Sequence, residues 1–259
     1  MKIIFAIAKI VLKELLRRKD AYVLLIITAL LTLMSGSVHF FGDMKMVRYM
    51  KELCLLLVWI SSIVIAVTLA ARQIYAERES RTLFSLLAKP MSRNQLIFGK
   101  FLGCWLACGA ALFIFYTFFV VTAVSRGEHL RLAENFQAFW MHWVMLGVIV
   151  AMVLAGSLLF AAPSSNATIS FVIILAILML GRHLGKLALQ MSEPFQTVTT
   201  VLYFAMPHLE FYDLRDLLTH DWPLVRWDVV GLATLYGAAY AGIFLGLACF
   251  LFRRKPLTT

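Results

Sequence analysis

The sequence predicts an all-α polytopic membrane protein with six transmembrane helices, and two observations support this fold class. Of the 259 residues, 62% are hydrophobic and only 15% are charged, whereas soluble domains carry about 25% charged residues. Several apolar runs also approach or exceed about 18 residues, the length that indicates a membrane span. We expect the whole chain, residues 1–259, to form one transmembrane domain.

Residues 1–19 are expected to form an amphipathic helix that lies on the membrane surface. On a helical wheel its cations fall within roughly one quarter of the circumference, and its apolar side chains lie opposite. The cations are Lys2, Lys9, Lys13 and Arg17, and the apolar residues are Ile4, Ile7, Ala8, Val11 and Leu15. Lysines inside the apolar run, with no small-residue cleavage site after it, distinguish this segment from a signal peptide.

Six apolar runs define the predicted spans. They are residues 21–41, 53–71, 96–124, 139–161, 167–180 with an extension toward 189, and 229–252. The polar segments 42–51, 125–137 and 163–166 connect them as turns or loops. The longer segment 191–228 precedes the last span, and its first half is apolar at helical spacing but too short to cross the membrane. We therefore expect it to form a helical segment outside the membrane or at its surface.

A charged island, residues 72–100, interrupts the apolar pattern between the second and third spans. Its charges exclude it from hydrocarbon, because each buried charge would cost several kcal/mol. Pro90 ends a short apolar helix, and Ser92 with Gln95 has the spacing of a capping box that starts the next helix. The island is thus predicted to fold as helix, break and helix, a surface suited to contact a partner.

The distribution of cations predicts the orientation in the membrane. Six spans place both termini and the charged island on one side, which carries 15 of the Lys and Arg residues, and the opposite side carries nine. The positive-inside rule therefore places the termini and the island on the cytoplasmic side of the membrane. We expect this membrane to be the inner membrane of a bacterium. The net charge of +10 is explained by topology and anionic lipid headgroups rather than by nucleic acid.

A cluster of cations, Arg182, His183 and Lys186, follows the fifth span. Two interpretations remain open. The cluster could contact the anionic group of a substrate, or it could mark the membrane boundary, with long side chains extending into water.

Catalytic and metal-binding chemistry finds little support in the sequence. His208, Glu210, Asp213, Asp216 and His220 lie close together in segment 191–228 but lack any known metal-ligand spacing. No P-loop of the form GxxxxGK[ST] occurs, so we expect no nucleotide or other cofactor on this chain. The spans also hold few ionisable residues near their middles, which argues against an ion-coupled carrier. Energy for any transport is therefore expected to arrive from outside the membrane.

Small residues in the spans indicate close helix packing. Gly99 with Gly103 and Gly237 with Ala241 have the small-xxx-small spacing, as do Gly242 and Gly246. Such pairs serve contacts within a protomer or between protomers. The four cysteines all lie in predicted spans, and Cys104 and Cys108 are expected to act as small packing residues.

The charged island resembles the cytoplasmic loop after the second span in permease subunits of the ABC-2 type transporter family. The similarity lies in Glu77 to Leu83, in Leu86 to Arg93 with its Lys89-Pro90 step, and in Lys100. Arg81 stands where that family usually has glycine. The amphipathic start, the six spans, the stretch from Pro207 to Phe211 before the last span, and the basic C-terminus extend the resemblance to nearly the whole chain.

The resemblance implies a permease subunit of an ATP-driven exporter. It would pair with a second permease copy or a paralogue and with separate ATPase subunits, which would bind the ATP and magnesium. The island's short helix would dock on the ATPase as a coupling helix. The residues it implies for docking are Glu77, Glu79, Arg81, Leu83, Phe84, Leu87, Lys89, Pro90 and Arg93.

Two other function classes remain open at this point. A membrane scaffold or assembly factor could recruit a cytoplasmic partner through the same island, and an intramembrane enzyme could use the His and acidic residues of segment 191–228. The substrate is also open, because largely apolar spans suit a lipid-like or amphipathic cargo as well as ordinary lipid-facing walls.

Overall fold

The computed structural model describes residues 2–17, 22, 23, 26–30, 43–79, 92–129, 131–188 and 192–254. All regular structure in these ranges is helical. The elements are α1 (Lys2–Arg17), α3 (Asp43–Glu79), α5 (Arg93–Ser125), α6 (Leu132–Leu159), α7 (Pro163–Ala188), α8 (Phe195–Ala205), the 3-10 helix η1 (Leu209–Tyr212), α9 (Arg215–Thr219) and α10 (Trp227–Arg254). The predicted all-α class is therefore confirmed over the described part of the chain.

Five helices are long and apolar enough to cross a membrane. These stretches are Val47–Tyr75, Arg93–Ser125, Leu132–Leu159, Pro163–Gly181 and Trp227–Arg254, and they correspond to the second through sixth predicted spans. The first predicted span, 21–41, lies mostly outside the described residues. Its described parts, 22–23 and 26–30, are helical, and the Thr28 hydroxyl lies 3.3 Å from that of Ser61 on α3. The count of six stays a prediction.

Three predicted connections are wrong in their bounds. The predicted loop 125–137 is shorter than expected, because α6 already begins at Leu132. The segment 42–51 is expected to be a polar turn, but α3 already begins at Asp43. Residues 43–51 include neither glycine nor proline, and Arg48 pairs with Glu52 one turn later, at 3.3 Å. The turn at 163–166 is also helical, since α7 begins at Pro163. Proline is favoured at the first helical position, where its missing N–H costs no hydrogen bond.

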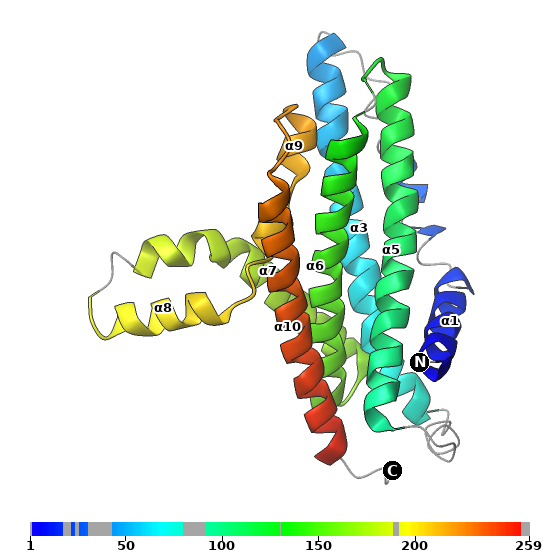
Figure 1. Ribbon diagram of the computed structural model, residues 1–259, viewed down its shortest axis with the longest axis vertical. Coiled ribbons are helices and arrows are strands. Elements are labelled where there is room, and N and C mark those ends of the chain that lie inside the picture. Colours follow the sequence, from blue (N-terminus) through cyan, green and yellow to red (C-terminus); the bar gives the residue numbers. More distant parts are fainter. Residues whose placement is uncertain are drawn as a thin grey trace.

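The bundle is formed by α3, α5, α6 and α10, which run side by side along the long axis (Figure 1). In α6, 83% of the span is buried, and this helix is the centre of the bundle. In α7 only 28% of the span is buried. This helix leaves the bundle at an angle, and α8 packs beside it to form a projecting hairpin (Figure 1).

A reciprocal tryptophan pair fastens α5 to α6. Trp105 donates to the Trp143 carbonyl at 2.9 Å, and Trp143 donates to the Trp105 carbonyl at 3.0 Å. The two rings stack with centroids 4.7 Å apart. Gly109 and Gly147 make room for them, since a Cβ at Gly109 would lie 2.5 Å from the Trp143 ring nitrogen. The indole N–H groups are thus satisfied at membrane depth, where an unpaired donor is costly.

The amphipathic helix α1 packs its apolar face against the first half of α5. Ile7, Ala8 and Val11 are buried, whereas Lys9 and Lys13 are exposed. A Cβ at Gly103 would lie 2.7 Å from Val11 Cβ and 2.9 Å from Ala8 Cα, so the two backbones approach closely only because this position is glycine. Close helix contact at the Gly99 and Gly103 pair is therefore confirmed, and it lies within the protomer.

Candidate coupling site at the end of the bundle that carries the charged island

We call the end of the bundle where α3 stops, α5 begins and α10 stops the island end, and the opposite end the far end (Figure 1). A buried ion pair joins the two helices that flank the island. Lys100 Nζ lies 2.6 Å from Glu77 Oε1, and the two side chains are 5% and 16% exposed. A charge buried to this degree is tolerated only with its partner. The last turns of α3 are therefore fixed to the first turns of α5.

Arg93, the first residue of α5, reaches across to the end of α10. Its Nη1 donates to the carbonyls of Phe252 at 2.8 Å and Arg253 at 3.2 Å. Its guanidinium also lies over the Phe252 ring, 5.6 Å from the centroid. The last carbonyls of a helix lack partners within it, and a cation there also matches the helix dipole. Arg93 thus caps α10 and ties it to α5.

Two further contacts join α3 to α1 and to the connection between α6 and α7. Gln73 on α3 donates to Glu14 of α1 at 3.0 Å. Tyr75, the last residue of the α3 span, donates to the Phe160 carbonyl at 2.5 Å. The residues that flank the island are therefore connected to α1, to α10 and to the α6–α7 turn.

The predicted capping box at the start of α5 is confirmed. Ser92 Oγ accepts from the Gln95 N–H at 3.2 Å, and Gln95 Oε1 accepts from the Ser92 N–H at 3.0 Å. Two N–H groups that the helix leaves without partners are thereby satisfied. The helix that leaves the island has a sharply defined start.

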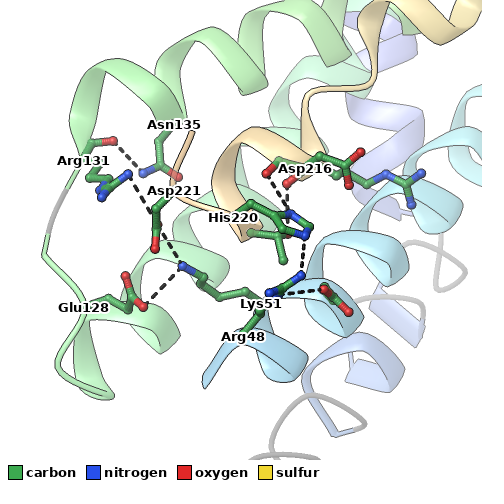
Figure 2. A network of polar contacts seen from close by, with 11 residues as sticks. Arg48, Lys51, Glu128, Arg131, Asn135, Asp216, His220 and Asp221 are labelled. Carbon is green, nitrogen blue, oxygen red and sulfur yellow. Dashed lines mark hydrogen bonds and ion pairs between the residues drawn. The ribbon is translucent and has the colours of Figure 1, made fainter. Parts of the chain in front are cut away.

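The far end is held by a network of charges from three segments (Figure 2). Lys51 of α3 is only 4% exposed and lies 3.3 Å from Glu128, which follows α5, and 3.2 Å from Asp221, which precedes α10. Arg131, just before α6, lies 3.4 Å from Asp221 as well. Asp221 adopts a left-handed backbone conformation with φ of 56°, which is uncommon outside glycine. Its Oδ1 atom pairs with both cations.

The comparison with known families decides what this bundle is. The model of the ABC-2 family of transporter proteins matches residues 54–257, which is most of the chain. The chain belongs to the ABC-2 transporter family. No curated protein sequence matches it significantly.

Membership makes this chain an integral membrane permease, and the membrane domain of such a permease is not itself catalytic. The family in general works with an ABC ATPase. The match covers the whole charged island, residues 72–100, and both of its flanks. It also covers the five spans of the structure from residue 54 onward.

Only some of the residues predicted for ATPase docking lie in the part of the chain that the structure describes. Glu77 and Arg93 make the contacts given above, and both hold the island's flanks in place. Glu79 is the last residue of α3, but its side chain lies outside the described part. Arg81, Leu83, Phe84, Leu87, Lys89 and Pro90 also lie outside the described residues. Docking through these side chains stays a prediction.

The predicted basic cluster falls on the projecting end of α7. His183 is exposed, and its ring nitrogen Nδ1 lies 3.1 Å from the Met179 carbonyl. The side chains of Arg182 and Lys186 are outside the described part. The cluster therefore lies on the α7–α8 hairpin, and its contact with substrate stays untested.

The His and acidic residues of segment 191–228 separate into different groups. His208 pairs with Glu210 at 3.0 Å, and both are buried beneath α8 and α10 aromatics. Asp213 binds Arg215 through two hydrogen bonds of 2.8 and 2.7 Å, and these bonds raise the pKa of the Arg215 guanidinium. His220 instead contacts Arg48 in the far-end network. Among the described residues, no group of three or more His, Cys, Asp or Glu side chains could hold a metal ion.

Arg215 is a partly buried cation, 27% exposed, and the sequence indicates only its side of the membrane. Its guanidinium lies 4.6 Å from the centroid of the Trp59 ring on α3. A cation over an indole face in a desolvated site contributes up to about 2 kcal/mol. The spacing of Asp213 and Arg215, two residues apart, gave no signal that they would pack against α3.

Proposed function

We propose that the chain is the permease subunit of an ATP-driven exporter and that the charged island transmits movement from separate ATPase subunits to the spans. The observation that supports this proposal best is the fastening of both flanks. The Glu77–Lys100 pair links α3 to α5, and Arg93 links α5 to α10. A displacement of the segment between these flanks would therefore be passed to three spanning helices together.

The island's own composition supports a docking surface. Leu83, Phe84 and Leu87 give its short predicted helix an apolar face, and charged residues flank that face. An amphipathic helix of this kind inserts into an apolar groove on a partner. The contacts that join α3, α5 and α10 would then turn a movement of the docked ATPase into a rigid-body movement of these helices.

The same proposal extends to assembly and orientation. Two permease copies, or this chain and a paralogue, form the translocation path, and the termini and the island face the cytoplasm at a bacterial inner membrane. The family supports the ATPase partner in general, and the distribution of 15 and nine cations supports the orientation. The cargo has an apolar part, and Arg182, His183 and Lys186 are the candidates for contact with its anionic group.

To test this proposal, the permease is co-expressed with an ABC ATPase whose gene lies next to the permease gene. Phe84→Asp and Glu79→Lys are expected to abolish co-purification of the ATPase and its stimulation in vesicles, because they place the wrong charge in the docking surface. Trp222→Asp is the matched control, since Trp222 is an exposed aromatic residue in the far-end loop. ATP turnover that is the same in all three variants and the wild type would exclude coupling through the island.

A further inference from the structure

A groove of about 240 Å³ opens between α5, α6 and α10, in the middle part of these spans. Aromatic side chains of α5 and α6 form its walls, and small residues with one leucine of α10 form its floor. The walls include Phe101, Trp105 and Trp140, and the floor includes Ala238, Gly242 and Leu245. We call this hollow the α5–α10 groove. It belongs neither to the island nor to the far-end network.

The side chains that line the groove offer no free hydrogen-bond donor to a ligand. The groove's polar side-chain groups are two indole N–H groups and one hydroxyl. Trp105 donates to the Trp143 carbonyl at 2.9 Å, and Trp140 donates to the Thr234 hydroxyl at 3.0 Å. Thr234 in turn donates to the Val230 carbonyl at 2.8 Å. A polar ligand would lose its hydrogen bonds to water without replacement, so the groove selects hydrocarbon.

The size of the groove fits a chain rather than a helix. A dry protein cavity of about 150 Å³ holds benzene, so the 240 Å³ of this groove hold a hydrocarbon segment of roughly eight to ten carbons. An α-helix with its side chains is about 10–12 Å wide and cannot enter such a volume. The stacked Trp105 and Trp143 rings, 4.7 Å apart, fix one wall, so the groove exists before a ligand binds.

Cations lie at the island end of the same seam between α5 and α10. Arg93 is eight residues before Phe101 on α5, and Arg253 is eight residues after Leu245 on α10. Each separation corresponds to about 12 Å along a helix. The acyl chains of one leaflet span about 15 Å, half of the hydrocarbon core. A chain whose phosphate lies at the arginines therefore reaches into the groove.

Arg253 is suited to hold that phosphate. It is exposed, and its Nε lies 3.4 Å from Asn94 Oδ1, the one contact of its guanidinium with another described side chain. A guanidinium presents five donors in a planar fork that matches a phosphate group. We propose that the α5–α10 seam binds an anionic phospholipid, with its phosphate at Arg253 and one acyl chain in the groove. This site goes beyond the proposed function and does not depend on coupling to an ATPase.

The glycines of α10 provide a test with a matched control. A Cβ at Gly242 or at Gly246 would meet no atom within 4 Å, but only Gly242 lines the groove. Gly242→Leu therefore starts its side chain in open space at the groove and is expected to occupy it, and Gly246→Leu adds the same side chain elsewhere on the helix. Native mass spectrometry of the detergent-purified permease, supplied with phosphatidylglycerol, measures retained lipid. We expect Gly242→Leu to retain about tenfold less, equivalent to about 1.4 kcal/mol, and Gly246→Leu to retain as much as the wild type.

The headgroup is tested with a second pair. Arg253→Gln removes the proposed phosphate contact, whereas Arg254→Gln removes the neighbouring cation, which lies over the Phe250 ring with its guanidinium 4.2 Å from the centroid. We expect only Arg253→Gln to lower retention of phosphatidylglycerol and to abolish its preference over phosphatidylcholine with the same chains. Equal retention by these two variants would overturn the assignment of the phosphate.

Other results contradict the site as a whole. If Gly242→Leu keeps its lipid but converts a dimer into a monomer, the groove is a contact between permease copies and not a lipid site. If this variant fails to fold, the wild type still decides: phosphatidylglycerol with a photoreactive group at its chain end should label Phe101, Trp105 or Gly242. Labelling of the exposed face of α7 in preference to these residues would also overturn the proposal.

Discussion

At the scale of single residues, the ion pair of Glu77 and Lys100 is the contact of the island end whose loss should destabilise the permease most, because both charges are largely buried. Loss of one partner of a buried ion pair costs about 3–5 kcal/mol, because the remaining charge loses the attraction that offset its desolvation. We therefore expect Lys100→Met to lower the thermal unfolding midpoint of the purified permease strongly. The double variant Glu77→Gln with Lys100→Met should recover most of the loss, since it removes both charges of the pair.

The exposed pair of Arg226 and Asp228 is the control for this prediction. Its atoms lie 2.7 Å apart, but the side chains are 81% and 55% exposed, so water screens the attraction. Such pairs contribute about 0–1 kcal/mol, and Arg226→Met should barely change the midpoint. A double variant as unstable as Lys100→Met would show that packing of the long lysine chain, and not its charge, stabilises this position.

Side-chain contacts between residues close in the sequence were predictable, and contacts between residues far apart in the sequence were not. Ser92 and Gln95 are three residues apart, so their capping box follows from spacing alone, and the structure contains it. The resemblance implies a docking role for Arg93, which stays a prediction. Its contact with the carbonyls of Phe252 and Arg253, about 160 residues away, was not predicted. No sequence pattern specifies a contact of that separation.

At the scale of elements, the packing of α1 on α5 depends on Gly103. A side chain there would meet Val11 Cβ at 2.7 Å and the Ala8 backbone at 2.9 Å, so Gly103→Leu forces the helices apart. Overpacking of this kind costs about 1–3 kcal/mol. We expect lower stability and faster proteolysis of the N-terminal helix, measured by limited digestion of the purified permease.

Gly231→Leu makes the same substitution on α10, where a Cβ meets nothing within 4 Å. It should leave both the unfolding midpoint and the digestion of α1 unchanged. If Gly103→Leu behaves like Gly231→Leu, then α1 is not held by this contact, and its buried face must be covered in another way.

Element types were largely predictable, and element ends were not. Apolar runs located the spans because hydrocarbon imposes a minimum length. The polarity of segment 42–51 predicts a turn, yet α3 includes residues 43–51, since charged residues without glycine or proline are compatible with a helix in water. The angle at which α7 leaves the bundle (Figure 1) depends on packing against α8, which composition does not reveal.

At the scale of the whole molecule, the two ends of the bundle are closed by different chemistry. The island end is joined by one buried pair and by a guanidinium on helix carbonyls, and the far end by Lys51 and its acidic partners from two loops (Figure 2). With both ends fastened, α3, α5 and α10 are expected to move as one body. This rigidity is what coupling through the island requires.

The orientation of this body in the membrane is the last prediction. His129 follows α5 at the far end and Ser165 lies in the first turn of α7 at the island end, and both are exposed. The native cysteines Cys54, Cys104, Cys108 and Cys249 are all buried, so they should react slowly with a thiol reagent. With α6 between the two sites, a membrane-impermeant maleimide on intact cells should label His129→Cys but not Ser165→Cys. Ser165→Cys should become reactive once the membrane is opened. The reverse labelling would place the island outside the cytoplasm, where no ATPase could reach it, and would exclude the proposed coupling.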